Sequence, residues 1–517
     1  MTHFRFVVVT LVVLGLGGAC SRRETTSTPS TQSPSEAPAF AELSALSVGP
    51  GGRIVDKEGR DVLLRGVNIT SLGDYYQGDP DNPPTIALTD EDWTQMEGYG
   101  VSVVRLIIHW SLIEPTRGNI DASYLDRISQ AVDAAQAHGI YTVIDMHQDA
   151  YTATISTPPG QTCPSGTKPA VGWDGAPAWA TLTDGASTCT PDERNASPAV
   201  RAAWNHFWEN SRGIRDRFVA AWGAVAQRFA GRTEVAGYDV LNEPEVSRPA
   251  AELTPLYDAL VKDSVAAIRS AEAATGPPHL IFVEPAIPAG DQSFGLVIPD
   301  PKRIGVEPTN IVSAPHNYAE SIPVASLSMD ADGFAAFATN IALGFGLPTW
   351  FGEYGFWDTS TDTLAKIRRY ATMEDKFKLG GAWWQWRQPC GDPHSLGDTR
   401  RTIDGITHLH HLDCPGDRHD RPTTEFVQAL SRAYPRKTPG SIVSISSDYE
   451  LGTFDLQATA TQPGQILEVW TPTASGTHHV TGTGIGAINE RQVGNGRILT
   501  ATVTAAGSYE LHITRAS

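Results

Sequence analysis

The sequence predicts an α/β protein, a (β/α)8 TIM barrel followed by a C-terminal β-sandwich, and three observations support this fold class. Short apolar runs alternate with amphipathic stretches over most of the chain. The runs are apolar throughout, which is typical of parallel strands that are covered on both faces. After Pro435 the composition shifts to Thr, Val, Ile, Ser and Gly in short alternating segments. We expect the barrel to span residues 45–436 and the sandwich residues 441–517.

Eight apolar runs are the expected strands of the barrel. They cover residues 62–69, 101–109, 140–146, 235–241, 279–284, 310–314, 349–352 and 381–386. Stretches with apolar residues at helical spacing lie between them, such as 124–135 and 218–225. In a barrel of eight such units, the chemistry lies at the C-terminal ends of the strands. Before the barrel, residues 53–64 predict a hairpin that turns at Lys57-Glu58-Gly59.

The N-terminal residues predict export. In residues 1–20, Arg5 precedes an apolar stretch that is too short to span a bilayer, and small residues follow it, as in a signal peptide. Cys20 comes directly after these small residues, so it is a candidate lipoprotein cysteine that would attach the protein to a membrane. The alternative is ordinary cleavage and secretion. Residues 21–44, rich in Ser, Thr and Pro, predict a flexible tether. We therefore expect an exported bacterial protein, secreted or anchored in the cell envelope.

The charge of the chain limits its partners. Lys and Arg number 39 against 58 Asp and Glu, a formal net charge of −19. This sign argues against nucleic acid as a partner, because phosphate binding requires basic residues. It suits a soluble, exported hydrolase that acts on neutral or diffusely charged material. We expect a monomer.

The cysteines predict disulfides. If Cys20 is an anchor, four cysteines remain, and in an exported protein they allow three pairings. We favour Cys163–Cys189 and Cys390–Cys414, because each closes one long loop. The alternative is a metal site that combines Cys414 with the nearby His408, His410 and His411. Zinc sites usually show tighter paired spacing, so we expect no metal and no cofactor.

Two of the predicted strands end in a glutamate. Residues 237–244 read Gly-Tyr-Asp-Val-Leu-Asn-Glu-Pro, so the strand would deliver Asn242 and Glu243 to its tip, where Pro244 ends the pairing. Residues 347–353 show the same pattern, a strand-like run that ends in a glutamate, Glu353. Two carboxylates about 5 Å apart, one a protonated acid and the other an ionised nucleophile, are the equipment of a retaining glycosidase. Alone, Glu243 could equally be a salt-bridge partner; the matching positions of the pair favour catalysis.

Other polar residues also fall at predicted strand ends. Arg105 lies within the second strand, where burial is costly unless it pairs, and we expect its partner to be the nucleophile carboxylate. Tyr318 could hydrogen-bond the same carboxylate, and Trp384 could stack under a sugar ring. Further candidates for substrate binding follow the third and sixth strands, namely His147, Gln148, Asp149 and His316. A lone His or Tyr is more often structural, so their shared location supports the set and not each member.

Two further segments have open roles. Residues 150–200 are rich in Gly, Pro, Thr and Ser and contain Trp173 and Trp179. A loop of this length at the catalytic face is usually functional, so we interpret it as a wall of the substrate site. The alternative is a segment that is merely braced by a disulfide. The sandwich could bind sugar or lipid, or only pack against the barrel; we favour packing, with Trp470 in its core.

These residues resemble glycoside hydrolase family 5 of clan A. The matching pieces are Arg105, His147, Asn242-Glu243-Pro244, His316-Asn317-Tyr318, Phe351-Gly352-Glu353 and Trp384. A narrower resemblance, to bacterial endoglycoceramidases, rests on the sandwich and on two motifs. These are Asp-Met-His-Gln-Asp-Ala-Tyr at 145–151 and Gly-Ala-Pro-Ala-Trp-Ala at 175–180.

The resemblance implies a reaction and roles. The reaction is cleavage of the β-glycosidic bond between the first sugar and ceramide in glycosphingolipids, which releases intact oligosaccharide. Glu243 would be the acid/base and Glu353 the nucleophile, whose charge should help to keep Glu243 protonated. Asn242 would hold the 2-hydroxyl of the sugar. The remaining contacts to the first sugar would come from Gln148, Asp149, Trp179 and Trp384.

The chain differs from some family members at one position, and two alternative functions remain open. Some family members carry a Lys shortly after the first strand, but residues 68–76 contain none, so an endogalactosylceramidase is an open variant. Among enzymes, the rival is an endo-β-glucanase or mannanase of the same clan. Outside enzymes, the rival is a surface lipoprotein that only binds glycans, which would need neither glutamate.

Overall fold

The computed structural model describes residues 43–515 except 79, 192, 287–294, 307–309, 322–328, 357–361, 397–423 and 474–477. The expected signal peptide, Cys20 and nearly all of the tether lie outside these residues, so export and lipidation stay predictions. Residues Phe40–Ser517 belong to one compact unit. Among the described residues, none of the helices is both long and apolar enough to span a membrane.

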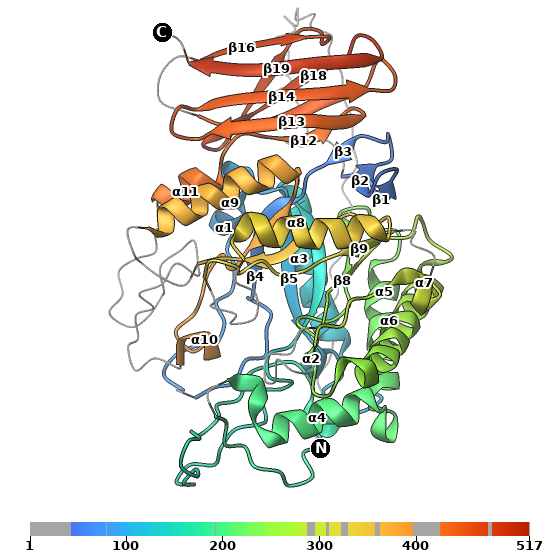
Figure 1. Cartoon of the computed structure of the whole chain (residues 1–517), viewed down its shortest axis with the longest axis vertical. Helices are drawn as coiled ribbons and strands as arrows, with labels where there is room; N and C mark the ends of the chain where they lie inside the picture. Colours follow the sequence, from blue (N-terminus) through green and yellow to red (C-terminus); the bar gives the residue numbers. More distant parts are fainter. Residues whose placement is uncertain are drawn as a thin grey trace, which may run out of the picture. The chain divides into compact units, whose positions relative to one another are not determined.

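Eight parallel strands form the predicted barrel (Figure 1). In chain order they are β4 (Arg65–Ile69), β5 (Val103–His109), β6 (Tyr141–His147), β7 (Val235–Asp239), β8 (Leu280–Val283), β9 (Ile311–Ser313), β10 (Phe351–Tyr354) and β11 (Gly381–Trp383). The sheet order is β10-β11-β4-β5-β6-β7-β8-β9. The two outer strands meet where the Ser313 amide donates to the Pro348 carbonyl at 2.9 Å and the Trp350 amide donates to Ser313 at 3.0 Å. Each predicted run thus overlaps one barrel strand, which confirms the fold class.

Helices cover the outside of this sheet. They are α1 (Asp90–Gly98), α2 (Trp110–Ile113), α3 (Ala122–Ala137), α4 (Pro198–Trp208), α5 (Ile214–Phe229), α6 (Ala250–Glu272), α7 (Pro301–Ile304), α8 (Ala331–Gly344), α9 (Thr363–Phe377), α10 (Pro393–Leu396) and α11 (Thr424–Leu430). Asp121 caps α3, whose buried face includes Tyr124, Ile128 and Val132, as the helical spacing predicts. Between β8 and β9 the only helix among the described residues, α7, has four residues.

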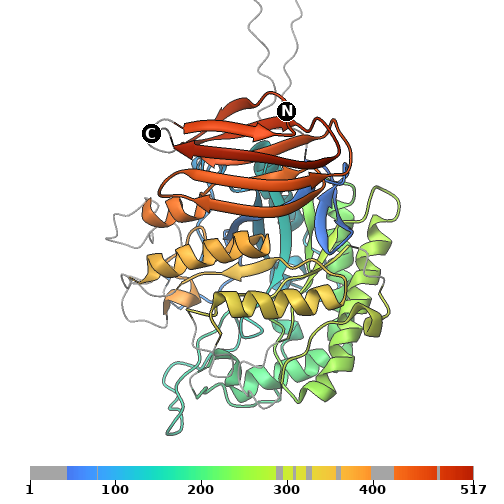
Figure 2. The ribbon, with the colours of Figure 1, turned by 45° about the horizontal axis from the view of Figure 1, so that its top comes forward.

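The C-terminal strands form the predicted sandwich (Figure 2). One sheet has the order β13-β14-β19-β16, from β13 (Ser441–Asp448), β14 (Thr453–Ala460), β19 (Gly507–Arg515) and β16 (His478–Thr483). The other has the order β1-β2-β3-β12-β15-β18-β17. Its late strands are β12 (Tyr434–Thr438), β15 (Ile466–Pro472), β17 (Asn489–Val493) and β18 (Gly496–Thr502). Its early strands are β1 (Leu46–Gly49), β2 (Arg53–Asp56) and β3 (Asp61–Val62), which include the predicted hairpin.

The early strands change the expected division of the chain. Residues 46–62, assigned to the barrel by the sequence, pair in the sandwich sheet, where Lys437 of β12 is aligned with Val62 of β3. The strands before the barrel and β12 after it therefore belong to the same sheet as β15, β17 and β18 of the sandwich. The expected boundary at 436–441 does not divide this sheet.

The insertion after β6 is braced as expected. Cys163 and Cys189 form a disulfide across a sequence separation of 26 residues. The insertion also contains two short 3-10 helices, η1 (Ala178–Ala180) and η2 (Arg194–Ala196). Cys414 lies outside the described residues, as do His408, His410 and His411, so the Cys390–Cys414 pairing and its metal-site alternative stay untested.

Trp470 joins the sandwich to the barrel. Its side chain is fully buried in the sandwich core. Its indole also lies against Gly100, next to α1, where a Cβ atom would come 2.3 Å from the ring. The Tyr434 hydroxyl donates to the Gly100 carbonyl at 2.6 Å. These contacts support a packing role for the sandwich.

Gly100→Ala should therefore destabilise the protein. Gly100 has a φ of +79°, and an added methyl group would also collide with Trp470, so we expect a loss of about 3 kcal/mol in urea unfolding. Gly118→Ala is the matched control, because Gly118 has a φ of +85° but open space around it; it should lose about 1 kcal/mol. Equal losses would show that the contact with Trp470 contributes nothing.

Candidate active site

The two predicted glutamates meet at the barrel mouth, meaning the C-terminal ends of its strands. Glu353 lies in β10 and Glu243 follows β7. One oxygen of each carboxylate and a ring nitrogen of His316 lie within 4.8 Å of one another. The Glu353 side chain is 6% exposed and that of Glu243 is 33% exposed. This proximity fits a retaining glycosidase, because an inverting one needs a wider gap for water.

Arg105 forms an ion pair with Glu353. Its guanidinium is fully buried in β5 and its Nη1 donates to Glu353 Oε1 at 2.7 Å, the partner that the sequence predicts. Three more carboxylates surround it at 2.9–3.0 Å, from Asp145, Asp239 and Glu284. Burial lowers the pKa of Arg105, but these carboxylates raise it well above its usual value. The guanidinium therefore stays charged.

The four carboxylates around Arg105 do not all carry a charge. Burial raises the pKa of Asp239 well above its usual value, and the Arg105 charge only partly opposes this. The pKa of Glu284 is also raised by burial, against the lowering effect of His316 and Arg105. Buried carboxylic acids that share one cation favour proton uptake over uncompensated charge.

Tyr318 and His316 contact the carboxylates of the two glutamates. The Tyr318 hydroxyl donates to Glu353 Oε2 at 2.9 Å, as the sequence predicts. The Nδ1 atom of His316 lies 2.9 Å from Glu243 Oε1 and 3.5 Å from Glu353 Oε2. Burial lowers the pKa of His316, but Glu284, Glu353 and Glu243 together raise it well above its usual value. His316 is therefore an imidazolium between two carboxylates.

The backbone at Glu243 is fixed by side chains of neighbouring strands. Glu243 has a φ of +37°, a region that costs energy for any residue with a side chain. Its amide donates to Glu284 Oε2 at 2.9 Å, and Gln148 Nε2 donates to the carbonyls of Asn242 and Glu243 at 2.9 and 3.0 Å. The Asn242 amide oxygen accepts from Arg105 at 3.0 Å. These contacts aim the Glu243 carboxylate into the mouth.

Two cations lower the pKa of Glu243. Burial alone would raise this pKa, but the hydrogen bond and charge of His316 and the charge of Arg194 lower it below its usual value. His316 Nδ1 lies 2.9 Å from Glu243 Oε1, and Arg194 Nη2 lies 3.1 Å from Glu243 Oε2. The expectation that the charge of Glu353 helps to keep Glu243 protonated stays a prediction.

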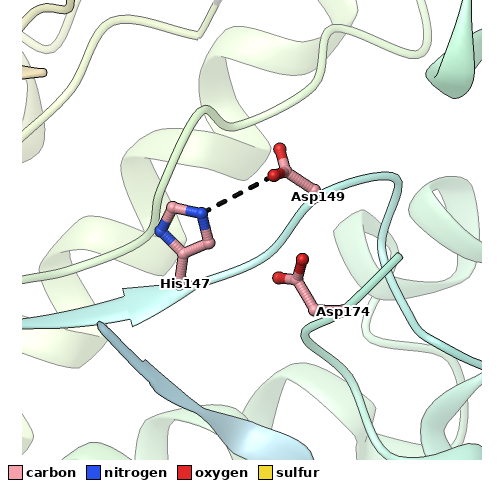
Figure 3. Close-up of side chains that lie close together, drawn as sticks. All are labelled: His147, Asp149 and Asp174. Carbon is pink, nitrogen blue, oxygen red and sulfur yellow. Dashed lines mark ion pairs between the residues drawn. The ribbon is translucent and has the colours of Figure 1, made fainter. Parts of the chain in front are cut away.

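The sugar-binding candidates form a second cluster beside the glutamates. Trp384 stacks on His147, with ring centroids 5.5 Å apart and planes 16° from parallel. His147 Nδ1 lies 2.7 Å from Asp145, and its Nε2 lies 3.7 Å from Asp149 (Figure 3). Asp174 completes a trio whose ligand-type atoms lie within 4.8 Å of one another. Since Arg194 and His394 already pair with Asp149, we interpret the trio as a polar wall rather than a metal site.

Several residues of the mouth were missed by sequence reasoning. Glu284 closes the predicted fifth strand, and its position alone could have identified it. Arg194 comes from the insertion, and His394 comes from the short helix α10 after β11, where no periodicity guides prediction. Arg194 pairs with Glu243 and Asp149, and its guanidinium lies 4.6 Å from the centre of the Trp173 ring.

Trp179 has a different environment from the other candidates. Its indole N–H donates to the Glu114 carbonyl at 2.8 Å, and its ring meets Trp110 edge-on with centroids 5.2 Å apart. None of its described contacts is with either glutamate, so its predicted contact with the first sugar stays a prediction.

Comparison with known proteins agrees with this site. Residues 55–389 match the family described as Cellulase (glycosyl hydrolase family 5). The chain belongs to this family. It is therefore a glycoside hydrolase, and the alternative of a lipoprotein that only binds glycans is not supported.

Individual proteins with similar sequences or structures indicate which members of the family this chain resembles. A crystal structure of endogalactoceramidase is 35% identical, with a TM-score of 0.82, and the match covers 92% of this chain and 100% of the other. Endoglycoceramidase I of Rhodococcus hoagii (strain 103S) is 26% identical over 81% of this chain and 78% of its own length. Endo-glycoceramidase II from Rhodococcus sp., solved as a lactosyl-enzyme intermediate, shares the fold, with 24% identity, a TM-score of 0.67 and coverage of 90% and 99%.

Glu353→Gln should abolish turnover while the fold survives. The substitution keeps the shape of the side chain but removes the carboxylate that faces Arg105 and Tyr318, so we expect at least about a thousandfold loss of kcat. Glu320→Gln is the control, because Glu320 pairs with Arg369 outside the glutamate cluster. Kinetics and thermal unfolding of both variants provide the measurement, and retained activity in Glu353→Gln would rule out its role as nucleophile.

Proposed function

We propose that this glycoside hydrolase is a retaining endo-glycosidase that cleaves the linkage between oligosaccharide and ceramide in glycosphingolipids. The observation that supports it best is the pair of glutamates with oxygens within 4.8 Å, one of them held by Arg105 and Tyr318. The similarity to an endogalactoceramidase and an endoglycoceramidase supports the substrate class.

In the first step, Glu353 acts as nucleophile. Its carboxylate oxygen bonds to the anomeric carbon while the bond from that carbon to the ceramide oxygen breaks. Glu243 gives its proton to this oxygen, because an alkoxide is a poor leaving group and needs protonation. Arg105 and Tyr318 orient the Glu353 carboxylate for the attack. The product is a glycosyl-enzyme and free ceramide.

In the second step, Glu243 acts as base. It takes a proton from water, the water oxygen bonds to the anomeric carbon, and the bond to Glu353 breaks. The sugar leaves with its original anomeric configuration, and Glu243 is protonated again. The amide oxygen of Asn242 accepts from Arg105, and its NH2 group donates one hydrogen to the Gln148 carbonyl at 3.0 Å. We propose that the second hydrogen of this NH2 group faces the 2-hydroxyl of the sugar.

An apolar groove on the barrel is a candidate site for a lipid aglycone. The groove has a volume of about 270 Å³, and its lining residues come mostly from α8 and from the segment between α6 and α8. Val283 and Pro285 of the lining flank Glu284 in the chain, and Pro315 precedes His316. We propose that the groove takes a hydrocarbon chain of ceramide.

Product analysis tests the proposed function. We would incubate residues 45–517 in mild detergent with neutral, ganglio-series and gala-series glycosphingolipids. The expected products are intact oligosaccharide and ceramide, and the series cleaved fastest decides between a broad endoglycoceramidase and an endogalactosylceramidase. Release of single sugars, or cleavage of glucan or mannan only, would overturn the ceramide linkage while leaving the family unchanged.

Phe337→Ser tests the groove. Phe337 lines the groove on α8 and is 37% exposed, so we expect KM for a glycosphingolipid to rise about tenfold, with little change for a soluble aryl glycoside. Leu343→Ser is the matched control, because Leu343 lies on the same helix and is 50% exposed but does not line the groove. Equal effects on both substrates, or none, would contradict the proposal.

A further inference from the structure

We propose that Arg194 is a positioning residue that holds Glu243 and Asp149 in the empty site and leaves Glu243 when the first sugar binds. This inference rests on the proposed function, since it assigns the acid/base role to Glu243. It concerns a residue of the insertion, outside the motifs that support the family resemblance.

Arg194 reaches the mouth from η2. Its Nη2 lies 3.1 Å from Glu243 Oε2 and also contacts Asp149 Oδ1. The guanidinium covers Trp173, and the side chain is 25% exposed. Because its guanidinium is planar and always charged, Arg194 links the insertion to Glu243 and to Asp149 at the same time.

Both oxygens of Glu243 therefore face cations. Oε2 faces Arg194, and Oε1 faces the imidazolium of His316 at 2.9 Å. As an acid, Glu243 carries a proton on one of these oxygens, and that oxygen then has less capacity to accept from an N–H donor. Departure of one of the two cations frees an oxygen of Glu243 to carry the proton and present it to the ceramide oxygen.

Arg194 is the cation that can move. His316 is 3% exposed and is held from its other nitrogen by Glu284 at 3.2 Å. Arg194 is more exposed and keeps a second partner, Asp149, when it leaves Glu243. Asp149 is itself held by His394, whose Nε2 lies 3.2 Å away. Further charged or titratable groups around Glu243, Arg194 and Asp149 are Glu193, Asp174, His147, Glu284 and Glu353.

The movement predicts a specific pH signature. The profile of kcat/KM reports the ionisation of the free enzyme, and the profile of kcat reports that of the substrate complex. The basic limb of each profile reports loss of the Glu243 proton. If Arg194 contacts Glu243 only in the empty site, removing its charge raises the pKa of Glu243 in the free enzyme alone. The basic limb of kcat/KM should then move to higher pH, while that of kcat stays in place.

The experiment compares Arg194→Met and Arg194→Lys with the wild type on a soluble alkyl β-glycoside, whose alkoxide leaving group needs the Glu243 proton. For Arg194→Met we expect the basic limb of kcat/KM to move up by about one pH unit. Arg194→Lys keeps the charge and should move it less. Arg248→Met is the control, because Arg248 pairs with Glu209 at 2.8 Å, away from the glutamates; its profiles should match the wild type.

Each outcome decides the inference. An equal shift of both limbs would show that Arg194 stays on Glu243 in the complex, and no shift would show that the pair does not form in solution; either result overturns it. Thermal unfolding identifies a variant that fails to fold, in which case Arg194→Lys decides by its own shift. A failure of the proposed function gives a different result: the wild type would then cleave the alkyl glycoside without releasing ceramide from a glycosphingolipid, and the pH profiles of the variants could still be measured.

Discussion

The structure depends on one buried cation. Burying a guanidinium without partners costs many kcal/mol, and Arg105 is fully buried in the barrel. Its four carboxylate partners come from β6, β7, β10 and the residue after β8, so half of the strands contribute to its compensation. Because the partners sit at successive strand ends, the same contacts that stabilise the charge also position Glu353 and Glu284. Catalytic geometry and the stability of the barrel mouth are therefore coupled.

The two glutamates differ in burial and in how firmly their partners are held. Glu353 is almost buried and is fixed by Arg105 and Tyr318, which suits a nucleophile that must stay ionised and oriented. Glu243 is a third exposed, and the cations on it belong to two different segments, one of them the exposed edge of the insertion. A residue that alternates between acid and base needs partners that can be exchanged. The two environments therefore support the proposed roles of Glu353 as nucleophile and Glu243 as acid/base.

The sequence predicted what depends on periodicity and strand ends. Each barrel strand followed from an apolar run, and Glu243, Glu353 and Arg105 followed from their places in those runs. Arg194 was missed because its position is set by the folding of an aperiodic insertion. The pairing of β3 with β12 was not predicted, because the two strands lie more than 370 residues apart, a distance over which local pattern says nothing about pairing. The lowered pKa of Glu243 was not predicted, because it depends in part on Arg194 from the insertion.

Identification of the covalent intermediate tests the central claim most directly. A 2-deoxy-2-fluoro β-glycoside with a good leaving group slows the second step more than the first, so the glycosyl-enzyme should accumulate. Mass spectrometry of the digested protein should then place one sugar on the peptide that contains Glu353. An adduct on Glu243 or Glu284, or hydrolysis with inversion and no adduct, would contradict the assignment of Glu353 as the nucleophile of a retaining enzyme.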